Sequence, residues 1–115
     1  MAKYERTFRG DFDEVLRVCS DIVMNSISAS VEDSSSFRSG DVRVAVIVYE
    51  RYSWLGGNRV SLNLTVVGHG NEIFVSAITS GGSQAVFFKI NRFGEAAFLD
   101  KLVAGLDRYI GDRER

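Results

Sequence analysis

The chain has no proline, one cysteine and one histidine among its 115 residues. The single cysteine, Cys19, excludes an intramolecular disulfide and a cysteine-based metal cluster. The absence of proline fits strands and helices that run without interruption. A net charge of −1 gives no basic excess for nucleic acid. No stretch reaches the roughly 18 apolar residues of a membrane span. We therefore expect a cytoplasmic protein with no cofactor, no metal, no nucleic-acid partner and no membrane association.

The length and composition predict a single domain over residues 1–115. The hydrophobic content of 45% and charged content of 25% are typical of soluble globular proteins. A chain of this size can bury one core, which removes roughly two-thirds of its unfolded surface from water.

The first part of the chain predicts a strand followed by a helix. Residues 3–9 alternate in character, and Gly10 ends the alternation. Asp11 then offers an N-cap, with Glu14 in the capping-box position. The helix should end near Asn25. Its apolar positions have helical spacing: Phe12, Val15, Leu16, Cys19, Ile22 and Val23.

The middle of the chain predicts consecutive strands joined by glycine turns. Residues 42–52, 60–66 and 73–78 alternate in hydrophobicity, and residues 42–52 are apolar on both faces. Residues 28–36 indicate a weak edge strand, in which Ser34, Ser35 and Ser36 suggest a loop. Residues 85–90 are ambiguous: their composition favours a strand, but Ser83 could cap a short helix.

A second amphipathic helix should begin at Glu95. One apolar stripe defines it: Phe98, Leu99, Leu102, Val103, Leu106 and Ile110. The order is strand, helix, four or five strands, helix. We therefore predict an α+β fold with an antiparallel sheet of five to six strands, across which the C-terminal helix packs.

This layout resembles the TBP-like or helix-grip architecture, which includes START-type ligand-binding proteins. At the level of sequence, five stretches are similar to a small family of uncharacterised bacterial proteins, chiefly from Gram-positive anaerobes. They are residues 40–43 (Gly-Asp-Val-Arg), 49–53 (Tyr-Glu-Arg-Tyr-Ser), 56–61 (Gly-Gly-Asn-Arg-Val-Ser) and, above all, 78–85 (Ile-Thr-Ser-Gly-Gly-Ser-Gln-Ala) and 87–91 (Phe-Phe-Lys-Ile-Asn). The resemblance runs over nearly the whole chain and implies no known activity.

The loop from Ser80 to Gln84 is the sharpest candidate for a binding site. Its two glycines would let backbone N–H groups converge on an anion, with hydroxyls adding donors. An ordinary hairpin turn needs glycines as well, so both interpretations stay open. Either way we expect Gly81 or Gly82 at positive φ. The hypothetical ligand-binding residues are Ser80, Gly81, Gly82, Ser83, Gln84 and Asn91, with Lys89 or Arg92 as counter-charge.

A second candidate is an aromatic surface at the end of residues 42–52. Aromatic side chains close to arginine are typical anchors of protein interfaces, and they are equally common in the core at a sheet edge. The hypothetical interface residues are Tyr49, Tyr52, Trp54 and Leu55.

The remaining reactive residues have structural explanations. His69 lies between two glycines and should be an exposed turn residue, because no partner for catalysis is identifiable. Cys19 lies on an apolar helix face and should pack in the core. We therefore assign no catalytic residues.

The leading functional hypothesis is a non-enzymatic binding module. It would hold a small anionic or apolar ligand between sheet and C-terminal helix, or present its sheet to a partner. The alternative is a homodimer without ligand, and a weaker alternative is an enzyme using the Ser80–Gln84 loop. Coverage of Ala45, Ile47 and Tyr49 discriminates between the first two. Burial within the chain favours the binding module, and burial only by a second subunit favours the dimer.

Overall fold

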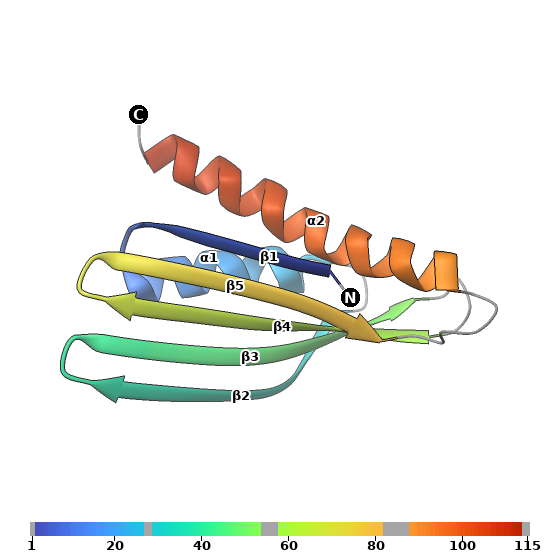
Figure 1. Ribbon diagram of the computed structural model, residues 1–115, viewed down its shortest axis with the longest axis horizontal. Helices are drawn as coiled ribbons and strands as arrows, with labels where there is room; N and C mark the ends of the chain where they lie inside the picture. Colours follow the sequence, from blue (N-terminus) through green and yellow to red (C-terminus); the bar gives the residue numbers. More distant parts are fainter. Residues whose placement is uncertain (1, 27–28, 54–57, 82–87, 114–115) are drawn as a thin grey trace.

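The fold is one antiparallel sheet with two helices (Figure 1). The computed structural model describes residues 2–26, 29–53, 58–81 and 88–113. The elements in chain order are β1 (Ala2–Arg9), α1 (Phe12–Met24), β2 (Ala29–Ser39), β3 (Val42–Ser53), β4 (Asn58–His69), β5 (Glu72–Gly81) and α2 (Phe88–Arg113). The predicted α+β class, the antiparallel sheet and the packed C-terminal helix are confirmed.

The strands lie in the order β1-β5-β4-β3-β2, and every neighbouring pair is antiparallel. The strands from β2 to β5 form a meander, as short glycine turns between alternating segments require. β1 then pairs with β5, which brings the start of the chain beside its third hairpin. β4 is therefore the central strand, and β1 and β2 are the two edges.

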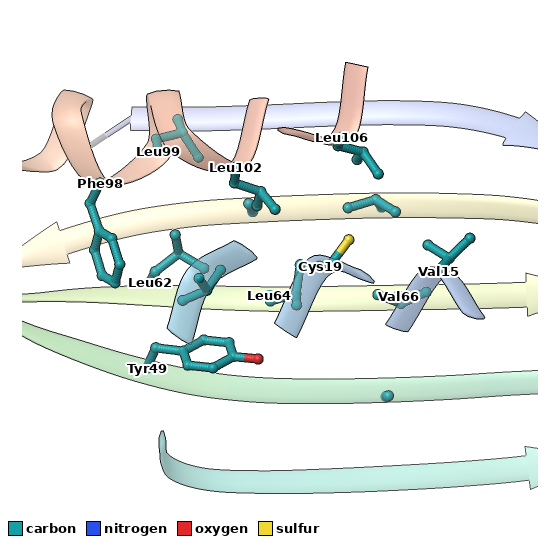
Figure 2. Packing of buried hydrophobic residues seen from close by; sticks show 14 of the residues in the cluster. Val15, Cys19, Tyr49, Leu62, Leu64, Val66, Phe98, Leu99, Leu102 and Leu106 are labelled. Carbon is teal, nitrogen blue, oxygen red and sulfur yellow. The ribbon is translucent and has the colours of Figure 1, made fainter. Parts of the chain in front are cut away.

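Both helices pack on the same face of the sheet. α1 contacts β2, β3 and β4, while α2 contacts β1, β5, β4 and β3. In Figure 2 the side chains of the central strand point toward the helices, and Leu62 and Leu64 lie opposite Leu102 and Cys19. The fully buried centre of this core includes Val15, Cys19, Tyr49, Leu62, Leu64, Val66, Phe98, Leu102 and Leu106.

The start of α1 follows the local signals in the sequence. The side chain of Asp11 accepts a hydrogen bond from the Glu14 backbone N–H at 3.0 Å, and the helix ends at Asn25. The Glu14 carboxylate accepts from the Tyr109 hydroxyl of α2 rather than closing a capping box. Asp11 therefore caps α1, and Glu14 links α1 to α2.

The prediction of a loop at Ser34–Ser36 was wrong. These residues lie in the middle of β2, an 11-residue strand that pairs with β3 along its length. The register shifts between Val31 and Asp33, where a bulge adds a residue. An edge strand needs backbone pairing on one side only. Serines are acceptable here because no helix covers most of β2, so both of its faces stay wet.

The preference for a strand at residues 85–90 was also wrong for the part that the structure describes. Residues 88–90 form the first turn of α2, which begins seven residues before the predicted start at Glu95. Residues 85–87 lie outside the described residues. The described sheet thus has five strands and no sixth.

The two helices approach closely because Gly105 has no side chain. A Cβ atom built there would lie 2.6 Å from Cδ1 of Ile22 on α1. Polar contacts then fix α2 at its outer side: Tyr4 of β1 donates a hydrogen bond to Asp107 at 3.0 Å, and Arg6 forms an ion pair with the same carboxylate. Gly105 therefore lets Ile22 pack closely against α2, and a side chain there would force Ile22 to shift.

Leu102→Ala tests the packing of α2 on the sheet. Leu102 is fully buried, so the substitution should lower the free energy of unfolding by about 2–5 kcal/mol. The exposed neighbour supplies a control, because Lys101→Ala should change stability by about 0.5 kcal/mol or less. Denaturant titration of both variants measures the difference. Equal stabilities would show that α2 does not depend on this contact.

Candidate functional site

The predicted anion-binding loop is only partly within the described residues. Ser80 and Gly81 are the last residues of β5, whereas Gly82, Ser83 and Gln84 lie outside the described residues. Asn91 is in the first turns of α2, and its side chain is not described. The Ser80 hydroxyl lies 2.8 Å from the Ser61 hydroxyl, so it is engaged within the sheet. The anion-binding role of this loop stays a prediction.

Gly81 confirms the conformational part of the prediction. Its φ is +123°, a backbone conformation that disfavours side chains. A Cβ atom at Gly81 would lie 2.5 Å from the carbonyl oxygen of Arg59 on β4. Glycine is therefore required here for two reasons, the dihedral angle and the close approach of β4.

The predicted aromatic interface divides between the two faces of the sheet. Tyr49 is fully buried under the helices, and its hydroxyl donates to Ser20 of α1 at 2.9 Å. Tyr49 belongs to the core, which corrects its assignment to an interface. Tyr52 points to the opposite face and is exposed. Trp54 and Leu55 lie outside the described residues.

The two candidate reactive residues are located as predicted. Cys19 is buried, and burial raises the pKa of its thiol to about 12, so it stays protonated and unreactive near neutral pH. His69 is exposed at the end of β4, with Nε2 3.6 Å from a carboxylate oxygen of Asp41. Among the described residues, no group of three His, Cys, Asp or Glu could hold a metal ion.

The space between the sheet and the helices is filled where the structure describes it. The buried residues of β4 and β5 meet those of α1 and α2 in one cluster. The largest hollow described lies outside this layer, between the outer sides of the helices. It has about 820 Å³, is shallow, and is lined by Ile22, Met24, Gly105, Lys101 and Arg108, among others. Within the described residues, the geometry thus offers no enclosed ligand cavity at the centre of the fold.

The opposite face of the sheet is a feature that the sequence analysis did not single out. Directly paired residues share a face, so the pairing defines one row across four strands: Phe37, Val44, Val67 and Phe74. Phe37 is 62% exposed, and the other three are half-buried. Below, "open face" denotes these four residues together with Val46, Val48 and Ile78, which lie on the same side.

The face of β3 that carries Ala45, Ile47 and Tyr49 is covered within the chain, which by the criterion stated above favours the binding module. A dimer would have to use the opposite face of the sheet. Ala45 and Tyr49 are buried by α1 and α2 of the same chain, and Ile47 packs against the same core. The alternate residues, Val44 and Val46, look away from the helices. The apolar character of both faces of β3 was visible in the sequence. The sequence pattern did not indicate which of the two faces the helices would cover.

Charged residues flank the open face at both edges. Lys3 of β1 and Asp33 of β2 occupy one cross-strand row, which runs Lys3, Ile78, Asn63, Val48, Asp33. Lys3 lies 3.9 Å from the Glu5 carboxylate, and both side chains are well exposed. This side of the sheet therefore has one apolar row beside the polar residues Ser61, Asn63 and Thr65 of β4, with Lys3 and Glu5 at the β1 edge and Asp33 at the β2 edge.

Two glycine variants separate backbone strain from steric conflict. Gly40 and Gly81 both have positive φ, but a Cβ atom meets nothing within 4 Å at Gly40. Gly40→Ala should cost about 1–2 kcal/mol for the left-handed conformation alone. Gly81→Ala should cost more, because the Arg59 carbonyl must move. Thermal or denaturant unfolding measures both. Equal losses would mean that β4 yields freely at this position.

Comparisons with known proteins find similar structures and a family, but they assign no activity. No curated protein matches it. The crystal structure of the hypothetical protein jhp0584 from Helicobacter pylori is similar with a TM-score of 0.50 and 12% identity, over 94% of this chain and 86% of the other. The crystal structure of TTHA0849 from Thermus thermophilus matches with a TM-score of 0.36 and 12% identity, over 98% of each chain. At 12% identity, the likeness to jhp0584 concerns the fold alone.

Among the described residues no helix is long and apolar enough to span a membrane. The TBP-like or helix-grip resemblance stays an expectation, because neither similar structure is described in those terms. A family model matches residues 1–110, nearly the entire sequence. The chain therefore belongs to the family of unknown function DUF6054.

Proposed function

We propose that this protein is a non-enzymatic interaction module that pairs with a second copy of itself through the open face of its sheet. The observation that carries the proposal is the row of Phe37, Val44, Val67 and Phe74, which no described element covers. Contiguous exposed apolar surface of this kind marks interaction sites in soluble proteins. Self-association was the alternative hypothesis from the sequence.

The size of the open face suits a dimer. Five strands span about 24 Å, and eight residues along a strand span about 26 Å, which gives about 600 Å² before side chains are counted. A standard specific interface buries about 800 Å² on each partner. Two such faces would pack as aligned sheets about 10 Å apart, as in a sandwich.

The charges at the two edges support a second copy as the occupant. Consider a twofold axis parallel to the central strand β4. It places β1 of one copy over β2 of the other and keeps each cross-strand row in register. Lys3 then faces Asp33 of the second copy, and the reciprocal pair forms by symmetry. Val67 of one copy then faces Val67 of the other copy at the twofold axis.

The ligand-binding and enzymatic hypotheses receive less support. A ligand held between the sheet and the middle of α2 would need space that Leu62, Leu64 and Leu102 occupy. An enzyme would need a reactive group. Yet Cys19 is buried and protonated, and His69 stands at an exposed turn with Asp41 as the partner described for it.

Phe37→Lys tests the apolar centre of the interface. The substitution places a charge in a row that would be buried between two sheets, so the protein should sediment as a monomer at ~100 μM, where the native chain forms a dimer. Met24→Lys is the matched control. Met24 is also an exposed apolar residue, at 42%, but it lies at the end of α1 on the helical side. This control should leave the dimer intact.

A charge exchange tests the geometry of the pair. Asp33→Lys should weaken the dimer by about tenfold, because it would face Lys3 of the other copy. Lys3→Glu should do the same, and the double variant should restore the native affinity. A native chain that is monomeric at ~100 μM, or a double variant no better than the single ones, would contradict the proposed arrangement.

A further inference from the structure

A hollow lies beside α1, where β2 extends beyond the helices. It has a volume of about 420 Å³, and its wall on α1 consists of Phe12 and Leu16. Ligand pockets in proteins have volumes of roughly 300–1,000 Å³, so the hollow has room for a small molecule. The strands β2 and β3 supply its other lining residues: Ser36, Phe37, Arg38, Arg43, Val44 and Ala45.

Two arginines face each other across the strands at this hollow. Arg38 of β2 and Arg43 of β3 are direct cross-strand partners, and both line the hollow. On its other side Arg43 pairs with Gly68, where a Cβ atom would lie 2.9 Å from the ring of Phe12 on α1. The two arginines therefore lie on the helical side of the sheet. Like charges directly opposite each other destabilise an antiparallel pair, and a negative charge beside them would relieve the repulsion.

Arg43 is held in place by groups of the chain itself. Its Nη1 donates a hydrogen bond to the Asp13 carboxylate at 2.9 Å, and its central carbon lies 4.4 Å from the centroid of the Phe12 ring. The hydrogen bond to Asp13 raises the pKa of Arg43, and the charge of Asp11 adds to this effect. Asp11 is the N-cap of α1, where its carboxylate accepts a backbone N–H. Asp13 is therefore the direct counter-charge of Arg43.

Arg38 contributes a second positive charge to the same position. The hydrogen bond from Arg43 lowers the pKa of the Asp13 carboxyl, and the charge of Arg38 lowers it further, so Arg38 acts on this ion pair. No hydrogen bond or ion pair joins Arg38 to another residue within the ranges that the structure describes. Arg38 is exposed, and the planar fork of its guanidinium can bind an anion.

We propose that this hollow binds the carboxylate group of a small molecule that has an apolar body. Both carboxylate oxygens would accept hydrogen bonds from the Arg38 guanidinium, and the body would lie against the half-buried side chain of Leu16. Arg43 would add positive potential from a fixed position. Asp13 directly neutralises one of the two arginine charges, so a monoanion matches what is left, and the planar fork matches the geometry of a carboxylate.

The hollow is separate from the surface of the proposed dimer. Arg38 and Arg43 lie on the helical side of the sheet, whereas the dimer would use the open face. The hollow is also formed within one chain, so binding there should be measurable whether or not the chain dimerises. Phe37 and Val44 border both surfaces, and the test therefore uses other residues.

The experiment is a titration of the ¹⁵N-labelled chain, followed by the amide resonances of residues 36–38 and 43–45. The probes are sodium benzoate, sodium acetate, benzamide and sodium phosphate, with sodium chloride keeping the ionic strength constant. Benzoate should give saturating shifts at millimolar concentration. Acetate should need about tenfold more because it lacks the apolar body. Benzamide should give no saturating shift, because it has the ring without the charge.

Arg38→Gln tests the role of the exposed arginine, and Arg17→Gln is its matched control. Arg17 is an exposed arginine of α1 that pairs with Asp21 at 3.8 Å, outside the hollow. Arg38→Gln should raise the benzoate concentration at half-saturation by about tenfold or more, whereas Arg17→Gln should leave it unchanged. Arg38→Lys keeps the charge without the planar fork, so it should recover only part of the affinity.

Stability supplies a second measurement. In chloride, Arg38→Gln should unfold at the same denaturant concentration as the native chain or at a higher one, because the repulsion with Arg43 is removed. A less stable Arg38→Gln would assign the arginine a structural role and overturn the proposal.

Three results of the titration would also contradict the proposal. Equal half-saturation in the native chain and in Arg38→Gln would mean that benzoate binds elsewhere. Shifts in benzoate no larger than those in chloride would mean that the hollow binds no carboxylate. Phosphate that saturates the same resonances at an equal or lower concentration would remove the preference for a carboxylate.

Discussion

The structure depends on one constraint: both helices cover the same face of a sheet that is wider than they are. Two packed helices span roughly 20 Å, whereas five strands span about 24 Å. α1 and α2 gather over β1, β5, β4 and part of β3, and β2 extends beyond them (Figure 1). This leaves two surfaces exposed, the edge strand β2 and the whole opposite face of the sheet.

The edge strand β2 and the open face differ in the character of their exposed residues. β2 is polar over most of its length, carries charges and contains a bulge, which are the features that discourage pairing with a further strand. The open face instead has valines and phenylalanines in a continuous row. The same molecule thus protects its edge and exposes an apolar face, and this contrast favours association through the face rather than through the edge.

Local sequence signals correctly predicted the elements whose structure depends mainly on their own residues. Asp11 caps α1 because its side chain reaches the Glu14 N–H, and the stripe from Phe98 to Ile110 packs because its spacing is helical. β2 and the first turns of α2 were missed, because pairing with β3 and the packing of α2 override weak local preferences. The covered face of β3 could not be deduced, since Ala45 and Val44 differ little in apolar character.

The candidate sites also differ in whether local sequence or tertiary packing determines them. Gly81 was predicted at positive φ from its Gly-Gly sequence, and the structure adds the reason, which is the Arg59 carbonyl oxygen beside it. Nothing local in Arg51 distinguishes it from the other ten arginines of the chain. Its position against the Phe98 ring follows from the packing of α2 on the sheet, which no local signal in the sequence predicts.

Gly81 also shows how the pairing of strands constrains the end of β5. The pairing of β2, β3, β4 and β5 places Ala29, Arg51, Val60 and Gly81 in one row across the sheet. In this row Gly81 lies so close to β4 that a Cβ atom would meet the carbonyl oxygen of Arg59 at 2.5 Å. Positive φ at Gly81 turns the chain out of β5 at that row. Glycine is the residue that meets both constraints here, the positive φ and the close approach of β4.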